Sequence, residues 1–363
     1  MGGGRQPFHR SPSLRRTYRE QGDNQLPVTR NDVAAAAGVS PSVVSYVLNG
    51  GPRPVSVAAR QRVLDAVSLL GYRPNGLARS LKTGQTNTLG LILPDASNPF
   101  FAELARGIED RAYEAGKSVL VCNSADDTVR ERFYLETLVE KRVDGIILVS
   151  ASWDEDLSDV LSRKVPVVTM DRYRAESQVS TVLFDNEHAG YEVTRHLLGH
   201  GHRRLALISG PRTAPVSSER LEGCRQAMGP GAEALLVVHD TAFSLAGGYR
   251  AAESLLSGTD TPTAIVCSSD VQAIGASAAL RNHGMRIPED VALGSIDGTA
   301  LAEYSSPSLT AVAQPIARMA DLAVQSVLGR EAKAHHTLKG MLLIGKSCGC
   351  QPGPRPTHVP SSV

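Results

Sequence analysis

The chain has 363 residues, with 38 Lys and Arg against 37 Asp and Glu, so its formal charge is only +1. This length exceeds one ordinary domain and allows a large buried core. The charge is unevenly distributed, because residues 1–86 hold 12 basic and 4 acidic residues whereas the rest of the chain holds 26 and 33. This asymmetry excludes an evenly neutral surface. It favours nucleic acid as the partner of the N-terminal part.

Residues 1–27 form a basic segment with five arginines. The segment has no apolar run, so we expect neither a signal peptide nor a membrane span there, and we expect it to be disordered. Contact with phosphates and a translation start further downstream both remain open as its explanation. A basic tail does not account for four further arginines that belong to the predicted helical region: Arg60, Arg62, Arg73 and Arg79.

Residues 41–49 predict an amphipathic helix, because apolar and polar side chains fall on opposite arcs when the residues are placed on a helix at 100° per residue. The apolar arc consists of Val43, Val44, Val47 and Leu48. The polar arc consists of Ser42, Ser45, Tyr46 and Asn49. Solvent exposure alone more usually selects Lys and Glu, whereas small hydrogen-bonding residues without an acid suit the major groove of DNA.

Capping residues mark the boundaries of three short helices. Thr29 with Asp32 has the pattern of a capping box, Gly38 permits a tight turn, and Ser40 and Ser56 are placed to cap the second and third helices. Four apolar residues of the third helix should close a small core before Gly71: Val63, Leu64, Val67 and Leu70. We predict an all-α helix-turn-helix with one supporting helix over residues 28–73, and a bundle for protein contacts is the alternative.

From Thr88 onward, short apolar runs alternate with amphipathic segments. The predicted strands are Thr88 to Leu93, Ser118 to Cys122, Gly145 to Val149, Val165 to Met170, Arg204 to Ile208, Ala264 to Cys267 and Val291 to Gly294. The predicted helices are Phe101 to Glu114, Glu187 to Leu198, Ser218 to Met228, Gly247 to Leu256 and Val271 to His283. This alternation predicts parallel sheets wrapped by helices, its length implies two lobes, and ligands of such sheets bind at the carboxyl ends of strands.

A dense series of motifs runs along the chain: Asp32-Val-Ala34, Ala37-Gly-Val-Ser40, Val44-Ser45, Val47-Leu-Asn49, Val63-Leu64, Gly71-Tyr-Arg-Pro-Asn75, Ala78-Arg-Ser-Leu81, Gly90-Leu-Ile92, Asn98-Pro-Phe-Phe101 and Val143-Asp-Gly-Ile146. Through them the chain resembles the lactose-repressor/galactose-repressor (LacI/GalR) family of bacterial transcription regulators over nearly its whole length. The resemblance implies a helix-turn-helix head with a hinge helix, followed by an α/β effector domain of two lobes similar to periplasmic sugar-binding proteins and joined by several crossings. The implied divisions are 1–27, a basic extension; 28–73, the DNA-binding domain; 74–86, the hinge and linker; 87–350, the effector-binding and dimerisation domain; and 351–363, a flexible tail.

Among the DNA contacts that the resemblance implies, Pro41, Ser42 and Tyr46 should face bases. A second group should lie mainly on phosphate: Ser40, Ser45, Asn49 and Tyr72. Thr29 is a further expected DNA contact. Tyr46 stands where the family frequently has arginine, so this chain lacks the fork that reads guanine through two hydrogen bonds. The operator sequence therefore cannot be transferred from relatives.

The resemblance also implies a hinge helix that forms on DNA and inserts a leucine into a minor-groove step. Leu81 holds that position, with Leu77 and Ala78 beside it and Lys82 near phosphate or the groove edge. Asn75 can cap this helix, although about two turns are too few to persist alone in water. An ordinary polar linker, the alternative, would not require two leucines at i and i+4.

Seven candidate cleft residues follow different strands at matching family positions: Phe100, Phe101, Asp171, Arg220, Phe243, Ser269 and Asp297. Acidic, basic and aromatic side chains together suit a polyhydroxylated ring, because charged groups bind hydroxyls and aromatic faces stack on CH groups. The alternatives are that Phe101 belongs to the core, that Asp171 caps a turn and that Arg220 forms a surface ion pair with a neighbouring glutamate. Ser269 replaces the asparagine that the family often uses as a ligand contact, so the identity of a sugar stays open.

Motifs for enzymatic chemistry are absent from the sequence: we find no phosphate-binding Gly-Lys-Ser/Thr loop, no dinucleotide glycine motif and no nucleophile elbow. His196, His200 and His202 have a spacing that metal sites use, but we favour a structural role for them. Five scattered cysteines indicate a reducing cytoplasm. Cys348 and Cys350 could bind metal or form a redox bridge, but without partner ligands a structural role is favoured, so we predict no metal and no cofactor.

We therefore expect a cytoplasmic, homodimeric regulator, a repressor by resemblance, that binds a near-palindromic operator and a small effector, a sugar by resemblance. Induction and corepression both stay open. Control by a protein corepressor and a role as a sugar-binding transport receptor are the alternatives, and the second would need an export signal. No leucine heptad follows Cys350, so we expect no coiled-coil tetramerisation tail.

Overall fold

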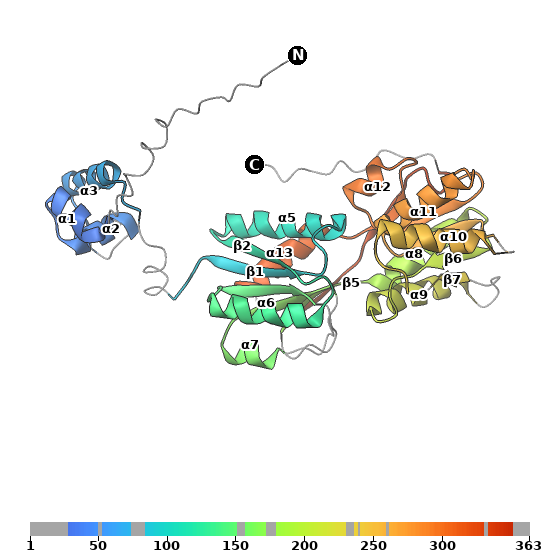
Figure 1. Cartoon of the computed structure of the whole chain (residues 1–363), viewed down its shortest axis with the longest axis horizontal. Helices are drawn as coiled ribbons and strands as arrows, with labels where there is room; N and C mark the ends of the chain where they lie inside the picture. Colours follow the sequence, from blue (N-terminus) through green and yellow to red (C-terminus); the bar gives the residue numbers. More distant parts are fainter. Residues whose placement is uncertain are drawn as a thin grey trace, which may run out of the picture. The chain divides into compact units, whose positions relative to one another are not determined.

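A computed structural model describes residues 28–49, 53–73, 84–150, 157–171, 179–229, 236–238, 240–258, 261–329 and 333–350. The chain divides into two compact units, Met1–Thr83 and Gly84–Val363. Figure 1 colours the elements of both units along the chain. Within the described ranges, no helix is both long and apolar enough to cross a bilayer.

The described part of the N-terminal unit is built from α1 (Arg30–Ala37), α2 (Pro41–Asn49) and α3 (Val57–Leu70). Small aliphatic side chains from the three helices form its core: Val33, Ala34, Ala37, Val44, Val47, Val63 and Ala66. Because each helix is too short to be stable alone, this shared core holds the helix-turn-helix together. The predicted all-α head is confirmed.

The helix ends of this unit follow the predicted caps. The backbone N–H of Thr29 donates to the Asp32 carboxylate at 2.8 Å, and the Thr29 side chain accepts from the Asp32 backbone N–H. Ser40 Oγ accepts from the backbone of the first turn of α2, at 3.4 Å, and Ser56 Oγ does the same for α3, at 3.3 Å. Gly38 ends α1 at φ +63°, a conformation that favours glycine.

Leu64 departs from the prediction that it belongs to this core. Its side chain is 42% exposed, whereas Ala66 is buried. The buried face of α3 runs through Val63, Ala66 and Leu70, at the i, i+3, i+7 spacing of one helix face. Leu64 lies one step around the helix from that face, so its assignment to the core was wrong.

The first sheet of the C-terminal unit has the strand order β11-β5-β4-β3-β1-β2, and all of its pairs are parallel. Its strands are β1 (Thr88–Leu93), β2 (Ser118–Asn123), β3 (Gly145–Val149), β4 (Val167–Met170), β5 (Ser180–Phe184) and β11 (His335–Leu338). Its covering helices are α5 (Pro99–Glu114) and α13 (Ile316–Val327) on one face, and α6 (Thr128–Glu140) and α7 (Ser158–Ser162) on the other (Figure 1). Both faces of the central strands β1, β3 and β4 are buried, as the apolar strand runs predicted.

The second sheet has the order β12-β10-β9-β8-β6-β7 and is parallel except for β12, which runs antiparallel to β10. Its strands are β6 (Leu205–Ile208), β7 (Leu236–Val238), β8 (Ala264–Cys267), β9 (Ala292–Asp297), β10 (Thr310–Ala313) and β12 (Met341–Leu343). Its covering helices are α8 (Asn186–Gly199) and α9 (Pro215–Met228) on one face, and α10 (Leu245–Leu256), α11 (Asp270–Asn282) and α12 (Ala300–Tyr304) on the other.

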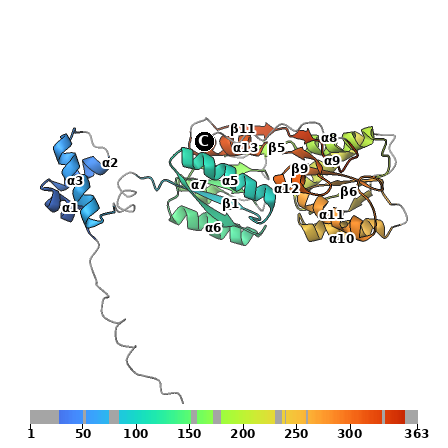
Figure 2. The ribbon, with the colours of Figure 1, turned by 90° about the horizontal axis from the view of Figure 1, so that it is seen from above.

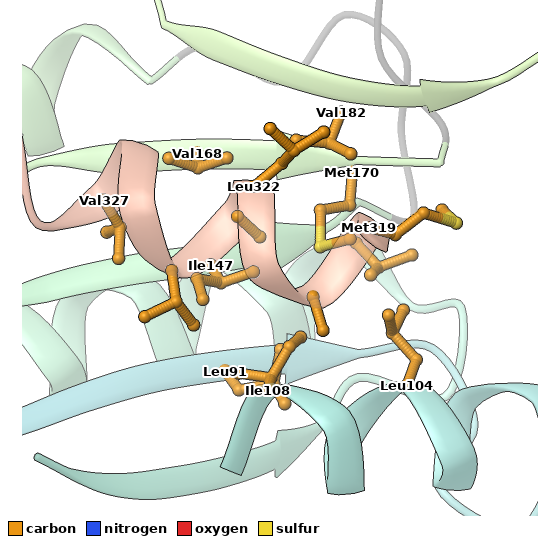
Figure 3. Close-up of a cluster of buried hydrophobic side chains, with 14 of the residues drawn as sticks. Leu91, Leu104, Ile108, Ile147, Val168, Met170, Val182, Met319, Leu322 and Val327 are labelled. Carbon is orange, nitrogen blue, oxygen red and sulfur yellow. The ribbon is translucent and has the colours of Figure 1, made fainter. Parts of the chain in front are cut away.

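The chain crosses between the two sheets after β5, after β10 and after β11. As a result, α13 follows a strand of the second sheet but lies against the first sheet (Figure 2). Met319 and Leu322 of α13 enter the core that β1, β3 and α5 also form (Figure 3). The two lobes are therefore not separate lengths of chain.

All seven predicted strands are present, and their ends differ from the prediction by at most three residues. Five strands were not predicted: β5, β7, β10, β11 and β12. Three of them lie at sheet edges, and most have only three or four residues, too few for a periodic pattern to emerge. The two-lobed α/β fold was predicted correctly, although these five strands were not.

Candidate functional site

The polar arc of α2 is accessible in the N-terminal unit. Four predicted DNA contacts are exposed, namely Thr29, Ser40, Ser42 and Asn49. Four others are partly buried, namely Pro41, Ser45, Tyr46 and Tyr72. The remaining five lie outside the described residues, so the hinge helix stays a prediction: Asn75, Leu77, Ala78, Leu81 and Lys82.

Two groups of this unit have structural partners. The Thr29 hydroxyl donates to the Asp32 carboxylate at 2.7 Å, and this hydrogen bond lowers the pKa of Asp32. The hydroxyl proton of Thr29 therefore already has an acceptor within the protein. Arg62 Nε donates to the carbonyl oxygen of Ala37 at 3.0 Å and ties α3 to the end of α1. Arg62 therefore supports the turn of the helix-turn-helix as well as adding positive charge.

A cavity that opens to solvent lies between the two lobes of the C-terminal unit. Its lining is Asn98, Phe100, Phe101, Asp171, Val216, Arg220, Phe243, Ser269, Asp297 and Gln314. All seven predicted cleft residues belong to this set, although whether they bind an effector remains a proposal. The cavity lies where parallel strands end, as such sheets place ligand sites.

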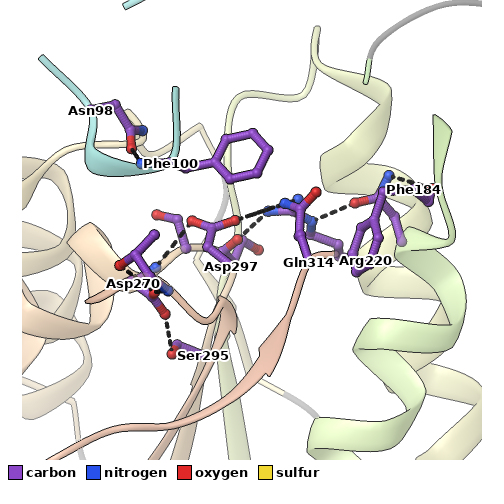
Figure 4. Close-up of polar contacts among 12 residues, drawn as sticks. Asn98, Phe100, Phe184, Arg220, Asp270, Ser295, Asp297 and Gln314 are labelled. Atoms are coloured by element: carbon purple, nitrogen blue, oxygen red, sulfur yellow. Dashed lines mark hydrogen bonds and ion pairs between the residues drawn. The ribbon is translucent and has the colours of Figure 1, made fainter. Parts of the chain in front are cut away.

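Asp297, at the end of β9, is the centre of the polar network in this cavity (Figure 4). Its Oδ1 accepts from Gln314 Nε2 at 3.0 Å and lies 4.0 Å from a guanidinium nitrogen of Arg220. Its Oδ2 accepts from the backbone N–H of Asp270 at 3.4 Å. Three elements of the second lobe therefore fix this carboxylate.

Arg220 is held by α8 and by the strand ends. Its Nε donates to Asn186 Oδ1 at 2.8 Å, and a second nitrogen donates to the carbonyl oxygen of Ser268. The residue is only 4% exposed. The alternative of an ion pair on the surface is therefore wrong, because the guanidinium turns inward toward Asp297.

Close contact between α8 and α9 places Arg220. A Cβ at Gly190 of α8 would collide with the backbone carbonyl of Arg220, and a Cβ at Gly223 of α9 would collide with that of Glu187. These two glycines let the helix backbones approach each other directly. Arg220 consequently lies deep enough to reach the cavity.

Burial changes the acidity of two carboxyl groups here. Burial raises the pKa of Asp297 to about 8; the Arg220 charge opposes this rise, and the Asp270 charge adds to it. Burial also raises the pKa of Asp270 to about 6, against hydrogen bonds from Ser295 and Thr299. Two acids and one guanidinium are thus packed close together in a poorly solvated region, and Asp297 and Arg220 of these three line the cavity.

The first lobe contributes an aromatic wall. Asn98 caps α5 by accepting from the backbone N–H of Phe100 at 3.0 Å, which fixes the position from which the Phe100 ring extends toward Asp297 (Figure 4). Phe101 packs edge-on against Phe100, with ring centroids 5.0 Å apart. Phe101 belongs to the core of the first lobe and also lines the cavity. It is therefore both a core residue and a cavity residue, the two positions that the sequence left open for it.

Three lining residues were missed by the sequence prediction: Asn98, Val216 and Gln314. Asn98 could have been found, because it opens the Asn98-Pro-Phe-Phe101 motif. Gln314 follows β10, which was not predicted as a strand, so no local signal marked it as a strand-end residue.

Two family profiles match nearly the whole described chain. Residues 29–75 match the bacterial regulatory proteins of the lacI family, and residues 86–338 match the periplasmic binding proteins and sugar-binding domain of the LacI family. The chain belongs to the LacI family. Its relatives are transcriptional repressors rather than enzymes, as the missing catalytic motifs predicted.

Individual members agree with this assignment. The HTH-type transcriptional repressor PurR of Photobacterium profundum is 37% identical over 316 residues, which cover 85% of this chain and 93% of the relative. The Lac repressor dimer bound to operator and an anti-inducer matches with a TM-score of 0.79 and 25% identity, over 89% of this chain and 99% of that one. The complex of the regulator CelR with cellobiose matches with a TM-score of 0.65 and 31% identity, over 88% and 99%.

One premise about the cysteines was wrong in this LacI-family chain. Cys348 and Cys350 were expected to have no partner ligands, but His196 and His200 lie beside them. Burial opposes ionisation of the Cys348 thiol, yet hydrogen bonds with His196, Thr310 and Cys350 lower its pKa to about 7. These groups are about 150 residues apart in sequence, so no local spacing could reveal them.

Proposed function

We propose that this LacI-family protein is a homodimeric repressor that binds a two-fold symmetric operator and is controlled by a sugar in the cleft of each chain. The cavity between the lobes is the observation that carries this proposal. It combines an acid, a guanidinium and an amide from one lobe with an aromatic ring from the other. Residues 1–27, 74–86 and 351–363 remain assigned to an extension, a hinge and a tail as proposals.

The polar groups of the cavity match a ligand rich in hydroxyls. Gln314 Oε1 is buried and has no hydrogen-bond partner among the described residues, and leaving such an atom unpaired costs about 1–3 kcal/mol. A ligand hydroxyl would donate to it, a second would donate to Asp297, and Arg220 would donate to a third. The Phe100 ring offers a face for the CH groups of a sugar ring.

The solved structure of CelR supports the same class of ligand, since that relative holds cellobiose. Ser269 caps α11 by accepting from the backbone N–H of Gln272 at 3.3 Å, so its side chain also has a structural task. A short hydroxyl at this position reaches less far than an amide would. We therefore commit to the class of ligand and not to one sugar.

The helix-turn-helix supports DNA as the partner of the N-terminal unit. We assign base contacts to Pro41, Ser42 and Tyr46 of α2, because its polar arc is accessible and carries no acid. Exposed Ser40 and Asn49 at the two ends of α2 suit phosphate contacts.

An open sheet edge in the first lobe supports a second copy of the chain as partner. Val121 of the edge strand β2 is 51% exposed, and Phe133 of α6 is 61% exposed. Exposed apolar groups along an open edge are a surface that proteins usually cover. The Lac repressor neighbour is a dimer on its operator, and a two-fold dimer would place two reading helices on two half-sites.

The coupling between cleft and DNA would pass through the segment that enters the first lobe. Thr86 donates its backbone N–H to Asp144 at 2.7 Å, and Lys117 pairs with the same carboxylate at 2.6 Å. This partly buried anchor fixes the end of the proposed hinge to β1 and β3. A hundredfold change in operator affinity requires about 2.7 kcal/mol of coupling, which lies in the usual range.

Two measurements on the full chain test this proposal. Selection of bound DNA from a random pool, at two salt concentrations, should give a two-fold symmetric site of roughly 14–20 base pairs. Thermal melting with a panel of sugars should raise the melting temperature for at least one, because only the folded state binds it.

Gln314→Ala should lose that rise and still select the same DNA. Gln325→Ala changes a half-buried glutamine of α13 that does not line the cavity, and it should keep both. If the protein binds DNA only in a salt-sensitive way and the selection enriches no sequence, the operator assignment is contradicted. Melting that responds to other small molecules and to no sugar would contradict the ligand class.

A further inference from the structure

Four side chains with metal-binding atoms meet where the last turn of α8 approaches the turn that follows β12. They are His196, His200, Cys348 and Cys350, and their ligand atoms all lie within 4.8 Å of one another. His196 Nε2 lies 3.3 Å from Cys348 Sγ and 3.8 Å from Cys350 Sγ. His200 Nε2 lies 3.0 Å from Cys350 Sγ. All four therefore point at one common volume.

We propose that these four side chains bind one zinc ion in tetrahedral geometry. Zinc bonds of about 2.0 Å to histidine nitrogen and 2.3 Å to cysteine sulfur, at tetrahedral angles, place nitrogen and sulfur about 3.5 Å apart. The three separations above lie on both sides of that value. Two histidines and two cysteines are also a donor set that structural zinc sites use.

The local structure of each pair explains how the four converge. His196 and His200 are four residues apart at the end of α8, so they share one face of the helix, and their rings lie edge-on with centroids 4.9 Å apart. Cys348 and Cys350 are two residues apart in a turn that backbone hydrogen bonds to Ser308 hold in place. Neither pair requires a large movement to close on an ion.

A partner outside the four ligands orients Cys348. Thr310 Oγ1 donates to Cys348 Sγ at 3.0 Å, and the same oxygen accepts from the backbone N–H of Gly345 at 2.9 Å. Such outer partners fix the orientation of the ligand, and a hydroxyl that donates to sulfur favours the thiolate, the form that binds metal. Cys348 is only 2% exposed and belongs to the apolar cluster of α8 and the second sheet, whereas His200 is exposed and leaves a path for the ion.

The proposed ion would have a structural role. All four positions of a tetrahedral ion are supplied by the protein, so none is left open for a substrate or a reactive water. The ion would join α8 to the turn at Cys348, which lies about 150 residues away in sequence. A link that closes so long a loop stabilises the folded lobe by restricting the unfolded chain.

The test uses the full chain without a polyhistidine tag, purified, loaded with zinc and freed of unbound metal. Elemental analysis should give one zinc per chain, and X-ray absorption at the zinc edge should show nitrogen and sulfur ligands. Replacement by cobalt should give the colour of a tetrahedral ion with thiolate ligands. Clearly less than one zinc per chain would overturn the proposal, and so would a Cys348–Cys350 disulfide in the metal-free protein as purified.

Variants locate the ion. His200→Gln and Cys348→Ser should each lose the zinc, and a chelator should lower the melting temperature of the unaltered protein but not of His200→Gln. His202→Gln is the matched control, because the nearby His202 is hydrogen-bonded to Thr263 and is not one of the four proposed ligands. Cys122→Ser, in the first lobe, is a second control. Equal zinc in ligand variants and controls would mark the metal as adventitious. Because His200 is exposed, its variant should fold even if Cys348→Ser does not.

Discussion

The two ends of α8 carry polar clusters of different character. At its N-terminal end, Asn186 binds Arg220 beside the cleft, where a guanidinium and a carboxylate are both nearly fully buried. At its C-terminal end, His196 and His200 meet two cysteines. The first cluster leaves buried hydrogen-bonding capacity for a ligand that comes and goes, whereas the second directs four donor atoms at one point and suits an ion that stays.

The largest effect should come from removing the charge at the cleft end. Arg220→Ala should lower the free energy of unfolding by about 2–6 kcal/mol, because two buried acceptors, Asn186 Oδ1 and the carbonyl oxygen of Ser268, would each lose a donor. Urea denaturation followed by circular dichroism measures this loss. Arg212→Ala removes an exposed pair with Asp240 and should cost about 1 kcal/mol or less. A loss for Arg220→Ala no larger than this control would contradict a supporting role in the cleft.

A smaller effect should follow from separating α8 and α9. Gly190→Ala should cost about 1–3 kcal/mol, because its Cβ would collide with the Arg220 backbone. If a sugar binds the cleft as proposed, the variant should also reduce the rise in melting temperature that the sugar causes, since Arg220 would move. Gly199→Ala, in the last turn of the same helix, meets no atom within 4 Å and should be neutral or slightly stabilising. Equal responses of the two variants would contradict the role of this close contact.

At the other end of α8, the outer hydroxyl should tune the proposed metal site. Thr310→Val removes the hydrogen bond to Cys348 and should weaken zinc binding by about tenfold, measured by competition with a coloured chelator. Thr263→Val changes a threonine that contacts His202 and should leave zinc affinity as it was. An unchanged affinity in Thr310→Val would show that the hydroxyl does not act on the metal.

A dependence of stability on pH should also arise at the cleft. The pKa of Asp297 rises from about 4 in the unfolded chain to about 8, so the folded state binds this proton more tightly and stability should fall as pH rises between those values. Asp297→Asn should flatten, without abolishing, the decline of the melting temperature, because Asp270 still contributes. Asp290→Asn is the control, since the pKa of Asp290 is lowered to about 2, below this window. Equal slopes in all three proteins would contradict the burial argument.

The helical head and the central strands were predictable because their signals are local. The capping box at Thr29, the turn at Gly38 and the apolar runs of β1 and β3 each act within a few residues of the chain. The strands β10, β11 and β12 were missed, since three or four residues carry too little pattern and their pairing depends on distant partners.

The sequence by itself determined the LacI-family organisation, the helix-turn-helix and the seven residues that line one cavity. The tertiary structure decided that Gln314 completes that cavity, that Arg220 turns inward, and that His196 and His200 meet Cys348 and Cys350. The physical reason is the separation along the chain over which each interaction acts. Caps and periodicity express interactions between near neighbours, whereas a cavity or an ion site forms only when crossings of the chain bring remote side chains together.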